Sequence, residues 1–352
     1  MEKPTPEFEE LGQLELLRRR NRVLEKIVRD QAADDAGALA IAGAIAENVQ
    51  SRPPVKVRKY APRKADPTVK GAILDIGDVH FMERVQARAT GGLYQYNAEV
   101  AADRYDYTIE EAIEIAKFHK LGELSVIFGG DLISGNIHDD LNRSNESMVA
   151  EQTIGFSEVA YGGIEKLLSA GLTLDTYWLS GNHGRTYFGK PYYKNKAQEN
   201  WDWMVAKMVE AYGKNQKGLN VHIPDTTWAI LEIAQRRFLT MHGDTVQFQK
   251  SMGISFYAIE KEMRRLKTMI ADGSIPLHHD VISHHQHQRF AVPIGNTMWY
   301  NNGALKGPDE YGHMGLRPPE EAQQQMLIVE NGRVKAHYPI VSQHIGAPTD
   351  ET

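Results

Sequence analysis

The chain has 352 residues, of which 41% are hydrophobic and 24% charged, and it contains 14 histidines and no cysteine. This length allows one large domain or two of ordinary size, and the apolar fraction is that of a globular protein with a sizeable core. The lack of cysteine excludes disulfide scaffolds, thiolate zinc sites, iron–sulfur clusters and cysteine nucleophiles. Any protein ligand of a metal would therefore be His, Asp, Glu or Asn.

The formal net charge of −6 argues against a uniformly basic nucleic-acid-binding protein. Basic residues outnumber acidic ones in the first 70 residues, and the remainder of the chain is acidic. No apolar run is long enough to span a membrane, and the start of the chain, MEKPTPEFEE, lacks the basic and apolar regions of a signal peptide. We therefore expect a soluble, cytoplasmic protein with no membrane partner.

Residues 1–50 are predicted to form an N-terminal helical segment. Apolar positions and one Asn recur there at alternating spacings of three and four, at Leu14, Leu17, Asn21, Leu24 and Val28. This pattern fits either a coiled coil that joins copies into a homodimer or higher oligomer, or a single amphipathic helix on the body. Residues 51–69 are basic and rich in proline, which predicts an extended linker. A solvated tether is favoured there over contact with a nucleic-acid backbone.

A domain of alternating strands and helices is predicted from residue 70 to residue 345, followed by a tail at 346–352. Apolar runs predict strands at 72–78, 124–130 and 173–181. Helical periodicity predicts helices near 108–122, 146–170 and 197–213. This alternation is typical of an α/β domain with parallel strands. After residue 219 short strands dominate, with one helix near 251–271, so the second half is expected to form a β-rich layer packed against the first.

The predicted strands end in polar residues that are able to bind a metal. In chain order these blocks are Asp78-Val79-His80, Gly130-Asp131, Gly181-Asn182-His183, Met241-His242-Gly243-Asp244 and His284-His285-Gln286-His287. Because strand carboxyl ends in α/β sheets converge over one crevice, these side chains are expected to gather there. Imidazole and carboxylate without thiolate suit Mn, Fe or Zn, and so large a set suits two ions that share an aspartate. Each block alone occurs by chance in many proteins, and their ordered appearance after strands is what indicates a site.

This arrangement resembles the calcineurin-like metallophosphoesterase superfamily, whose signature is D-x-H, G-D, G-N-H, an isolated His and G-H-x-H, in that order. The resemblance covers about residues 71–305. It implies an α/β fold in which two mixed β-sheets pack as a sandwich flanked by helices, here with the N-terminal helical extension. The Gly-Asn-His-Gly-Arg variant and the layout are most similar to the DNA-repair-exonuclease-like branch, which includes phosphoesterases found in phages.

Carried over residue by residue, the resemblance implies two divalent metal ions as cofactors, with Mn²⁺ favoured and Fe, Zn, Ni or Mg as alternatives. His183 matches the histidine that binds no metal and that protonates the leaving oxygen or stabilises the transition state. The implied ligands are Asp78, His80 and His287 for one ion, Asn182, His242 and His285 for the other, and Asp131 as the bridge between them.

Two positions depart from the superfamily's pattern. Gly184, followed by Arg185, stands where the family usually has an acid that orients the catalytic histidine. Orientation of that histidine must then come from elsewhere, or Arg185 contributes directly to phosphate binding. His284 replaces the glycine of the last block, which leaves the choice among three neighbouring histidines open, although the His-x-His spacing favours His285 and His287.

The activity that the resemblance implies is hydrolysis of phosphodiester bonds of nucleic acid or a nucleotide by a metal-activated hydroxide. A phage-encoded protein of this kind would work in the host cytoplasm. The candidate phosphate contacts are Arg185, His138 and Arg143. The segment 82–107 has three Arg and four Tyr, which either grip phosphate and stack on bases or pack within the protein.

Two alternatives remain open. The first is a phosphomonoesterase that acts on a nucleotide or a phosphoprotein, because the motifs alone do not choose the substrate. The second is a mainly structural or binding protein, in which the N-terminal helix and the basic linker are the working parts and the metal site is vestigial.

Overall fold

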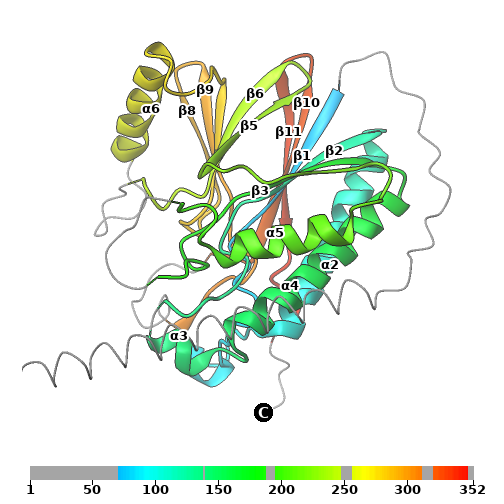
Figure 1. Cartoon of the computed structure of the whole chain (residues 1–352), viewed down its shortest axis with the longest axis vertical. Coiled ribbons are helices and arrows are strands. Elements are labelled where there is room, and N and C mark those ends of the chain that lie inside the picture. The colour runs from blue at the N-terminus through cyan, green and yellow to red at the C-terminus, as the bar shows by residue number, and fades with distance from the viewer. Residues whose placement is uncertain (1–69, 138, 188–194, 247–255, 311–319, 348–352) are drawn as a thin grey trace, which may run out of the picture. The chain divides into compact units, whose positions relative to one another are not determined.

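A computed structural model of the chain divides it into two units, Met1–Val55 and Lys56–Thr352. The structure describes residues 70–137, 139–187, 195–246, 256–310 and 320–347. The predicted N-terminal segment and linker lie outside the described residues, as do His138 and residues 348–352 of the predicted tail. The described part of the second unit is a sandwich of two β-sheets with helices on both outer faces (Figure 1).

The first sheet has six strands in the order β11–β10–β1–β2–β3–β4. Strands β1 to β4 run parallel to one another, and β10 and β11 extend the sheet in antiparallel register beyond β1. Strands β1 and β2 are almost continuously buried because helices cover one face of the sheet and the second sheet covers the other. The six strands are β1 (Lys70–Ile76), β2 (Glu123–Phe128), β3 (Thr173–Trp178), β4 (Leu219–His222), β10 (Gln323–Glu330) and β11 (Arg333–Val341).

Three long helices cover the outer face of this sheet, namely α2 (Ala98–Phe118), α4 (Val149–Ser169) and α5 (Trp201–Tyr212). Helix α2 begins well before the predicted helix at 108–122. Its start is fixed by Asn97, whose side chain caps the helix by accepting a hydrogen bond of 2.8 Å from the Val100 N–H. Two short helices lie in the loops, η1 (Ala87–Thr90) and α3 (Asp139–Ser144).

The second sheet has five strands in the order β5–β6–β7–β9–β8, and α6 (Phe256–Ala271) packs on its outer face. Two short edge strands, β4 and β8, were not predicted from the sequence. Pro293 lies within β8, where an edge position tolerates its missing N–H. The strands of this sheet are β5 (Trp228–Ile233), β6 (Arg236–Met241), β7 (Asp280–Ser283), β8 (Phe290–Ile294) and β9 (Thr297–Asn301).

The predicted fold class, two mixed sheets in a sandwich flanked by helices, is confirmed by the strand order and pairing. The expectation that the second half forms one separate layer is wrong for β10 and β11. These two strands return to the first sheet, where β10 pairs with β1 from Lys70↔Glu330 to Asp75↔Gln325. The chain therefore closes on itself next to its first described strand, and this places the segment before β10 beside the loop that follows β1.

Alternate side chains of one strand enter different cores. In β1, Ile73 lies between the two sheets, whereas Leu74 and Ile76 pack against the helices. A third apolar cluster joins α6 to the second sheet around the fully buried Trp299. Three apolar layers thus hold four layers of secondary structure together, and they leave the loops at the strand ends to carry polar groups.

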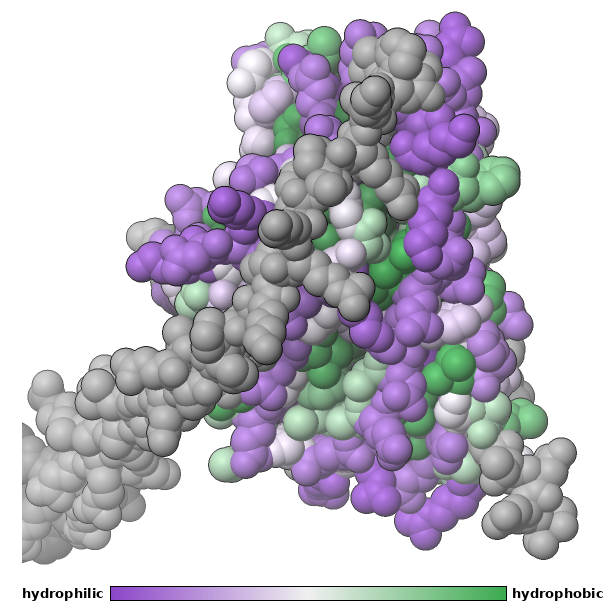
Figure 2. Space-filling view, turned by 90° about the vertical axis from the view of Figure 1, so that its right-hand side faces the viewer, coloured by the Kyte–Doolittle hydropathy of each residue, from purple (hydrophilic) through white to green (hydrophobic). Residues whose placement is uncertain are grey.

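Among the described residues, no helix combines the length and the apolar character that a membrane crossing needs. The face in Figure 2 is mostly hydrophilic, with smaller hydrophobic areas between the polar side chains. Large apolar side chains that are exposed, such as Phe118, Met148 and Leu277, come from separate elements.

A buried polar pair lies between the sheets, just below the loops of interest. His284 Nε2 is 2.8 Å from Asp75 Oδ1, and Asp75 Oδ2 accepts a hydrogen bond of 2.8 Å from Gln325. Burial lowers the pKa of His284, but the charge and hydrogen bond of Asp75 outweigh it and raise the pKa above the usual value. The imidazole fills the space beside Gly77 and Gly129, whose added Cβ atoms would overlap the ring. His284 therefore packs the first two motif loops against the last.

This packing predicts the effect of Gly129→Ala. We expect the added methyl to displace His284 and to lower the free energy of unfolding by about 1–3 kcal/mol, measured by urea denaturation. Gly122→Ala is the matched control, because no described atom beyond its two chain neighbours lies within 4 Å of a Cβ at that position. Equal stability of the two variants would contradict the prediction.

Candidate metal centre

Five loops at one edge of the sandwich carry the sequence-predicted site residues. Figure 1 shows β1, β2 and β3 running side by side, so their carboxyl ends reach the same edge. The side chains there are all buried or half-buried. The loops contribute Asp78 and His80 after β1, Asp131 after β2, Asn182 and His183 after β3, His242 after β6, and His285 and His287 after β7.

The first group of converging ligand atoms comes from Asp78, His80 and His287, and these atoms lie within 4.8 Å of one another. The Nε2 atoms of the two histidines are 3.2 Å apart, and His287 Nε2 is 3.7 Å from Asp78 Oδ1. This Asp78 oxygen is buried without a hydrogen-bond partner among the described residues. Burial raises the pKa of Asp78 to about 6 and lowers that of His287 to about 3. Neutral imidazoles around an unsatisfied carboxylate oxygen suit a cation.

The second group consists of Asp131, His242 and His285, again within 4.8 Å. His242 Nδ1 donates to the carbonyl of Gly129 at 2.9 Å, which directs Nε2 toward two oxygens. These are Asp131 Oδ2 at 3.1 Å and Asn182 Oδ1 at 3.2 Å. Although burial lowers the pKa of His242, the charge and hydrogen bond of Asp131 raise it to about 10. A cation between Nε2 and the two oxygens would take the place of this proton.

Asp131 connects the two groups. A carboxylate oxygen of Asp131 also lies within 4.8 Å of ring nitrogens of His80 and His183, and these three residues form a further group. The other carboxylate contact, at Oδ1, is a hydrogen bond of 2.7 Å from the His183 backbone N–H. Burial opposes ionisation of Asp131, but the charges of His242 and His183 hold its pKa well below the usual value. This fully buried carboxylate is thus placed to be shared.

His183 is oriented by the backbone rather than by an acid that follows it in sequence. Its Nδ1 is 2.9 Å from the Ser134 carbonyl oxygen, so Nδ1 carries a proton and donates it. The ring meets His80 edge-on, with 4.5 Å between the ring centroids. The position that Gly184 leaves without a side chain is therefore not needed to orient this imidazole.

The site stores backbone strain. Five non-glycine residues of the site have positive φ: Asp78, His80, Asp131, His285 and His287. Such angles are uncommon for residues with a side chain and cost about 1 kcal/mol or more each. They persist where the surrounding packing over-determines them, and here each turns a side chain from the end of a strand toward the common centre.

A second layer behind His80 was not predicted from the sequence. Glu83 Oε2 lies 3.4 Å from His80 Nδ1, the nitrogen that faces away from His287. Glu83 is held in turn by the buried Lys306, whose Nζ donates to Glu83 at 2.7 Å and to Asp309 at 2.8 Å. A carboxylate behind a ligand imidazole fixes its tautomer and raises its basicity. Because Lys306 is distant in the chain, no local pattern in the sequence reveals this layer.

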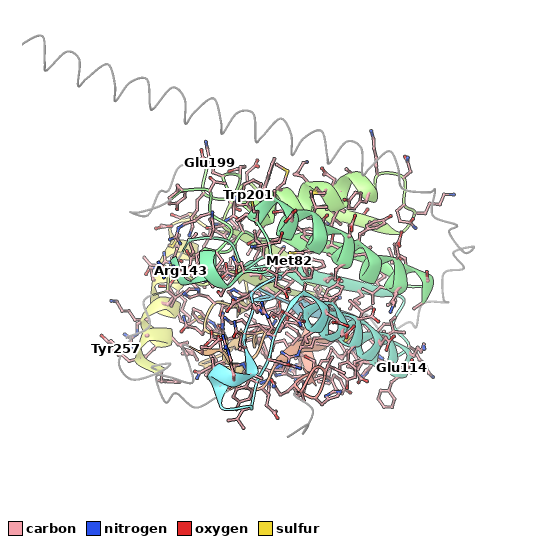
Figure 3. The ribbon with its side chains drawn as sticks, turned by 90° about the horizontal axis from the view of Figure 1, so that it is seen from below. Met82, Glu114, Arg143, Glu199, Trp201 and Tyr257 are labelled. Carbon is pink, nitrogen blue, oxygen red and sulfur yellow. The ribbon has the colours of Figure 1, made fainter. Side chains whose placement is uncertain are left out.

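Other predicted residues lie elsewhere. His284 points away from the ligand atoms toward Asp75, so of the three neighbouring histidines it is His285 and His287 that join the groups. Arg143 lies on α3 with an exposed side chain (Figure 3). Arg185 is half-buried and donates to the Asn182 carbonyl at 3.1 Å.

The segment 82–107 mainly packs within the protein. Tyr96 and Tyr105 are each 1% exposed, and Arg104 donates to the backbone carbonyls of Leu305 and Lys306. The interpretation in which these three side chains grip phosphate or stack on bases is therefore wrong. Arg84 and Arg88 are exposed, and for these two arginines a contact with phosphate stays a prediction.

The five motif blocks thus occupy loops at one edge of a sandwich of two mixed sheets, which is the arrangement that the sequence resemblance implies. No family model and no curated protein sequence matches the chain.

Solved structures similar to this chain include an archaeal phosphodiesterase, with 12% identity, 77% of this chain and 99% of that chain covered, and a TM-score of 0.34. Vacuolar protein sorting 29 from Cryptosporidium parvum matches at 12% identity over 78% and 99% of the two chains, with a TM-score of 0.36. The phosphoesterase YfcE from E. coli matches at 13% identity over 76% and 99%, with a TM-score of 0.31. Identities this low leave function to be argued from the residues of the site.

The donor set fits divalent cations. Each group combines imidazole nitrogens with a carboxylate oxygen, and the set includes the orphaned, buried Asp78 Oδ1. Asp78, His80 and His287 would hold one cation, and Asn182, His242 and His285 the other, with Asp131 between them.

Removing the shared carboxylate should affect both ions. We expect Asp131→Ala to lower the Mn²⁺ stoichiometry from about two per chain to none, measured by elemental analysis after gel filtration. Asp175→Ala is the control, because Asp175 is an exposed aspartate of β3 that pairs with His222. Binding of two ions by the Asp131→Ala protein would refute the bridging assignment.

Proposed function

We propose that this chain is a metal-dependent phosphodiesterase that hydrolyses phosphodiester bonds of nucleic acid or a nucleotide. The observation that carries the proposal is the position of Asp131, whose carboxylate belongs both to the group of His242 and His285 and to that of His80 and His183. A shared carboxylate between two sets of ligands is the arrangement that a pair of cations requires. We propose Mn²⁺ as the native metal, because mixed imidazole and carboxylate donors suit it.

Divalent cations held there would supply a nucleophile by lowering the pKa of water and would offset the negative charge of the phosphoryl oxygens. The protein's own contribution to proton transfer centres on His183. Since Nδ1–H donates to the Ser134 carbonyl, a second proton on this ring sits on Nε2. In that form His183 can give the proton to the leaving oxygen.

Arg185 is the first candidate for phosphate recognition. Arg185 follows the Gly-Asn-His block, and its NH1 donates to the carbonyl of Asn182, one of the proposed ligands. Its Nε is buried without a hydrogen-bond partner among the described residues. A planar guanidinium suits the oxygens of a phosphate group. Arg143 and His138 remain further candidates, Arg143 because it is exposed on α3.

The choice of a diester over a monoester rests on the resemblance of the Gly181–Arg185 segment to the DNA-repair-exonuclease-like branch. We further propose that the protein works in the cytoplasm, that of a host cell if it is phage-encoded. A homodimer or higher oligomer through the N-terminal helical segment is part of the same proposal.

The substrate class is tested with two model compounds. With Mn²⁺ present, we expect faster hydrolysis of bis-p-nitrophenyl phosphate than of p-nitrophenyl phosphate, measured by nitrophenolate release. The reverse order would favour the phosphomonoesterase, and no hydrolysis of either by metal-loaded protein would favour a structural or binding role. A screen of single-stranded DNA, duplex DNA, RNA, cyclic nucleotides and mononucleotides then identifies the natural class.

Loss of the proposed proton donor should leave the metals in place. We expect His183→Ala to bind Mn²⁺ normally while kcat for the diester falls about 10²–10⁴-fold, the usual contribution of a general acid. His222→Ala serves as the control, because His222 is an exposed histidine of the edge strand β4. A His183→Ala enzyme with near-normal kcat would exclude this role.

A further inference from the structure

We infer that Asp202, in the first turn of α5, is a positioning residue. It fixes the position of the loop that carries Asp131 relative to the loop that carries Asn182 and His183. Its effect on hydrolysis rests on the proposed function, whereas its effect on loop geometry and metal affinity does not. Asp202 belongs to none of the motif blocks and touches no proposed ligand side chain through its carboxylate. It acts on the backbone that carries them.

The carboxylate of Asp202 accepts three hydrogen bonds from backbone N–H groups. Oδ2 accepts hydrogen bonds of 2.9 Å from the backbone N–H groups of Asp131 and Gly181, and Oδ1 accepts one of 3.1 Å from Leu132. The residue is 1% exposed, so water does not compete for these donors. One side chain thus joins the loop after β2 to the loop after β3, at the positions that flank both proposed ligands.

The geometry requires a carboxylate. Three N–H donors converge on two oxygens, and an amide of the same size would present an NH₂ group to at least one of those donors. A buried backbone N–H that loses its partner costs about 1–3 kcal/mol. Burial and the charge of Asp131 raise the pKa of Asp202 to about 7, while the hydrogen bonds from the Gly181 and Leu132 N–H groups act in the opposite direction. The start of α5 also favours the ionised form, because Asp202 lies at the positive end of the helix. The N–H of Asp202 is itself capped by Asn200 at 2.9 Å.

Gly184 leaves the space that the side chains of Asn200 and Asp202 occupy. A Cβ at Gly184 would overlap Asn200 Oδ1 and lie 3.1 Å from Asp202 Cγ. The backbone is joined at the same place, since the N–H of Trp201, labelled in Figure 3, donates to the Gly184 carbonyl at 2.7 Å. The space beside the Gly-Asn-His block is therefore filled by side chains of α5, and the acidic group next to that block comes from α5.

The consequence reaches the site through Asp131. Its backbone N–H is held by Asp202, while its side chain accepts the His183 N–H at 2.7 Å and faces His242 Nε2 at 3.1 Å. A shift of this backbone would move the shared carboxylate relative to both histidines. Asp131 also has positive φ, a conformation that needs support from its surroundings.

The test is Asp202→Asn in the full chain, which keeps the volume and removes one acceptor. We expect Mn²⁺ affinity to fall about 10–100-fold, as for other residues that orient metal ligands, measured by calorimetry. Hydrogen exchange of the Asp131, Leu132 and Gly181 amides should become faster. At saturating Mn²⁺, kcat for bis-p-nitrophenyl phosphate should fall by a larger factor than KM rises.

The matched control is Asp280→Asn. Asp280 is also fully buried. It accepts a hydrogen bond of 2.9 Å from the Met298 backbone N–H and forms an ion pair with Arg236. It lies at the amino end of β7, away from the ligand loops. We expect this variant to lose thermal stability while its Mn²⁺ affinity stays unchanged, which separates loss of stability from loss of positioning.

A second variant keeps the inference falsifiable if Asp202→Asn does not fold. Asn200→Ala with Asp202→Ala empties the space beside Gly184, and adding Gly184→Asp returns a carboxylate there. We expect the triple variant to recover Mn²⁺ affinity relative to the double variant. Wild-type affinity and amide protection in Asp202→Asn, or no recovery in the triple variant, would overturn the inference. These readouts need no turnover, so a wild-type protein that cleaves no phosphodiester would defeat the proposed function alone.

Discussion

The structure depends on one constraint, which is that the Asp131 carboxylate must stay ionised and fixed while it is fully buried. A carboxylate buried there without partners would be protonated, since burial raises its pKa. The charges of two imidazoles and a backbone N–H offset this here. His183 supplies both an imidazole and the N–H from the loop after β3, and His242 supplies the other imidazole from the loop after β6. The carboxylate of Asp131 therefore connects loops that belong to both sheets. Divalent cations would strengthen the same balance, because they add positive charge where it is already required.

Rigidity below the site explains how strained ligands are tolerated. The polar pair of Asp75 and His284 lies under the loops and packs against Gly77 and Gly129, so the first and second motif loops meet the last through one buried imidazole. Apolar layers on both sides of the first sheet leave little room for that imidazole to move. The positive φ of Asp131 is a strained conformation that such rigid surroundings can maintain. The replacement of the motif's glycine by His284 therefore moves a structural contact into the sandwich and leaves the neighbouring His285 to face the site.

The sequence predicted those parts of the molecule in which chemistry and local pattern coincide. Strands β1 to β3 are runs of apolar residues, and the candidate ligands follow them directly, so both were visible along the chain. Short edge strands such as β8 lack that signal because they bury only part of their surface. The early start of α2 depends on one cap, Asn97, and helix boundaries of this kind are poorly defined by periodicity. The role of Glu83 behind His80 could not be predicted for another reason. Its partner Lys306 lies far along the chain, so only the fold brings the two side chains together.

Gly184 and Asp202 show that a group expected at one position of a motif can be supplied by a residue elsewhere in the chain. In the sequence, Gly184 stands where the resemblance leads us to expect an acid, so the orientation of His183 was expected to come from elsewhere, or Arg185 to contribute directly to phosphate binding. In the structure, the imidazole is held by the Ser134 carbonyl, and the space beside the motif is filled from α5. What a buried loop pair needs is an acceptor for its backbone N–H groups, and any element that can deliver a desolvated carboxylate to that point meets the need. A helix N-terminus is well suited to deliver it, because its dipole stabilises the negative charge. A glycine at position 184 is then a steric requirement of this solution, since any side chain there would exclude the α5 residues that take its place.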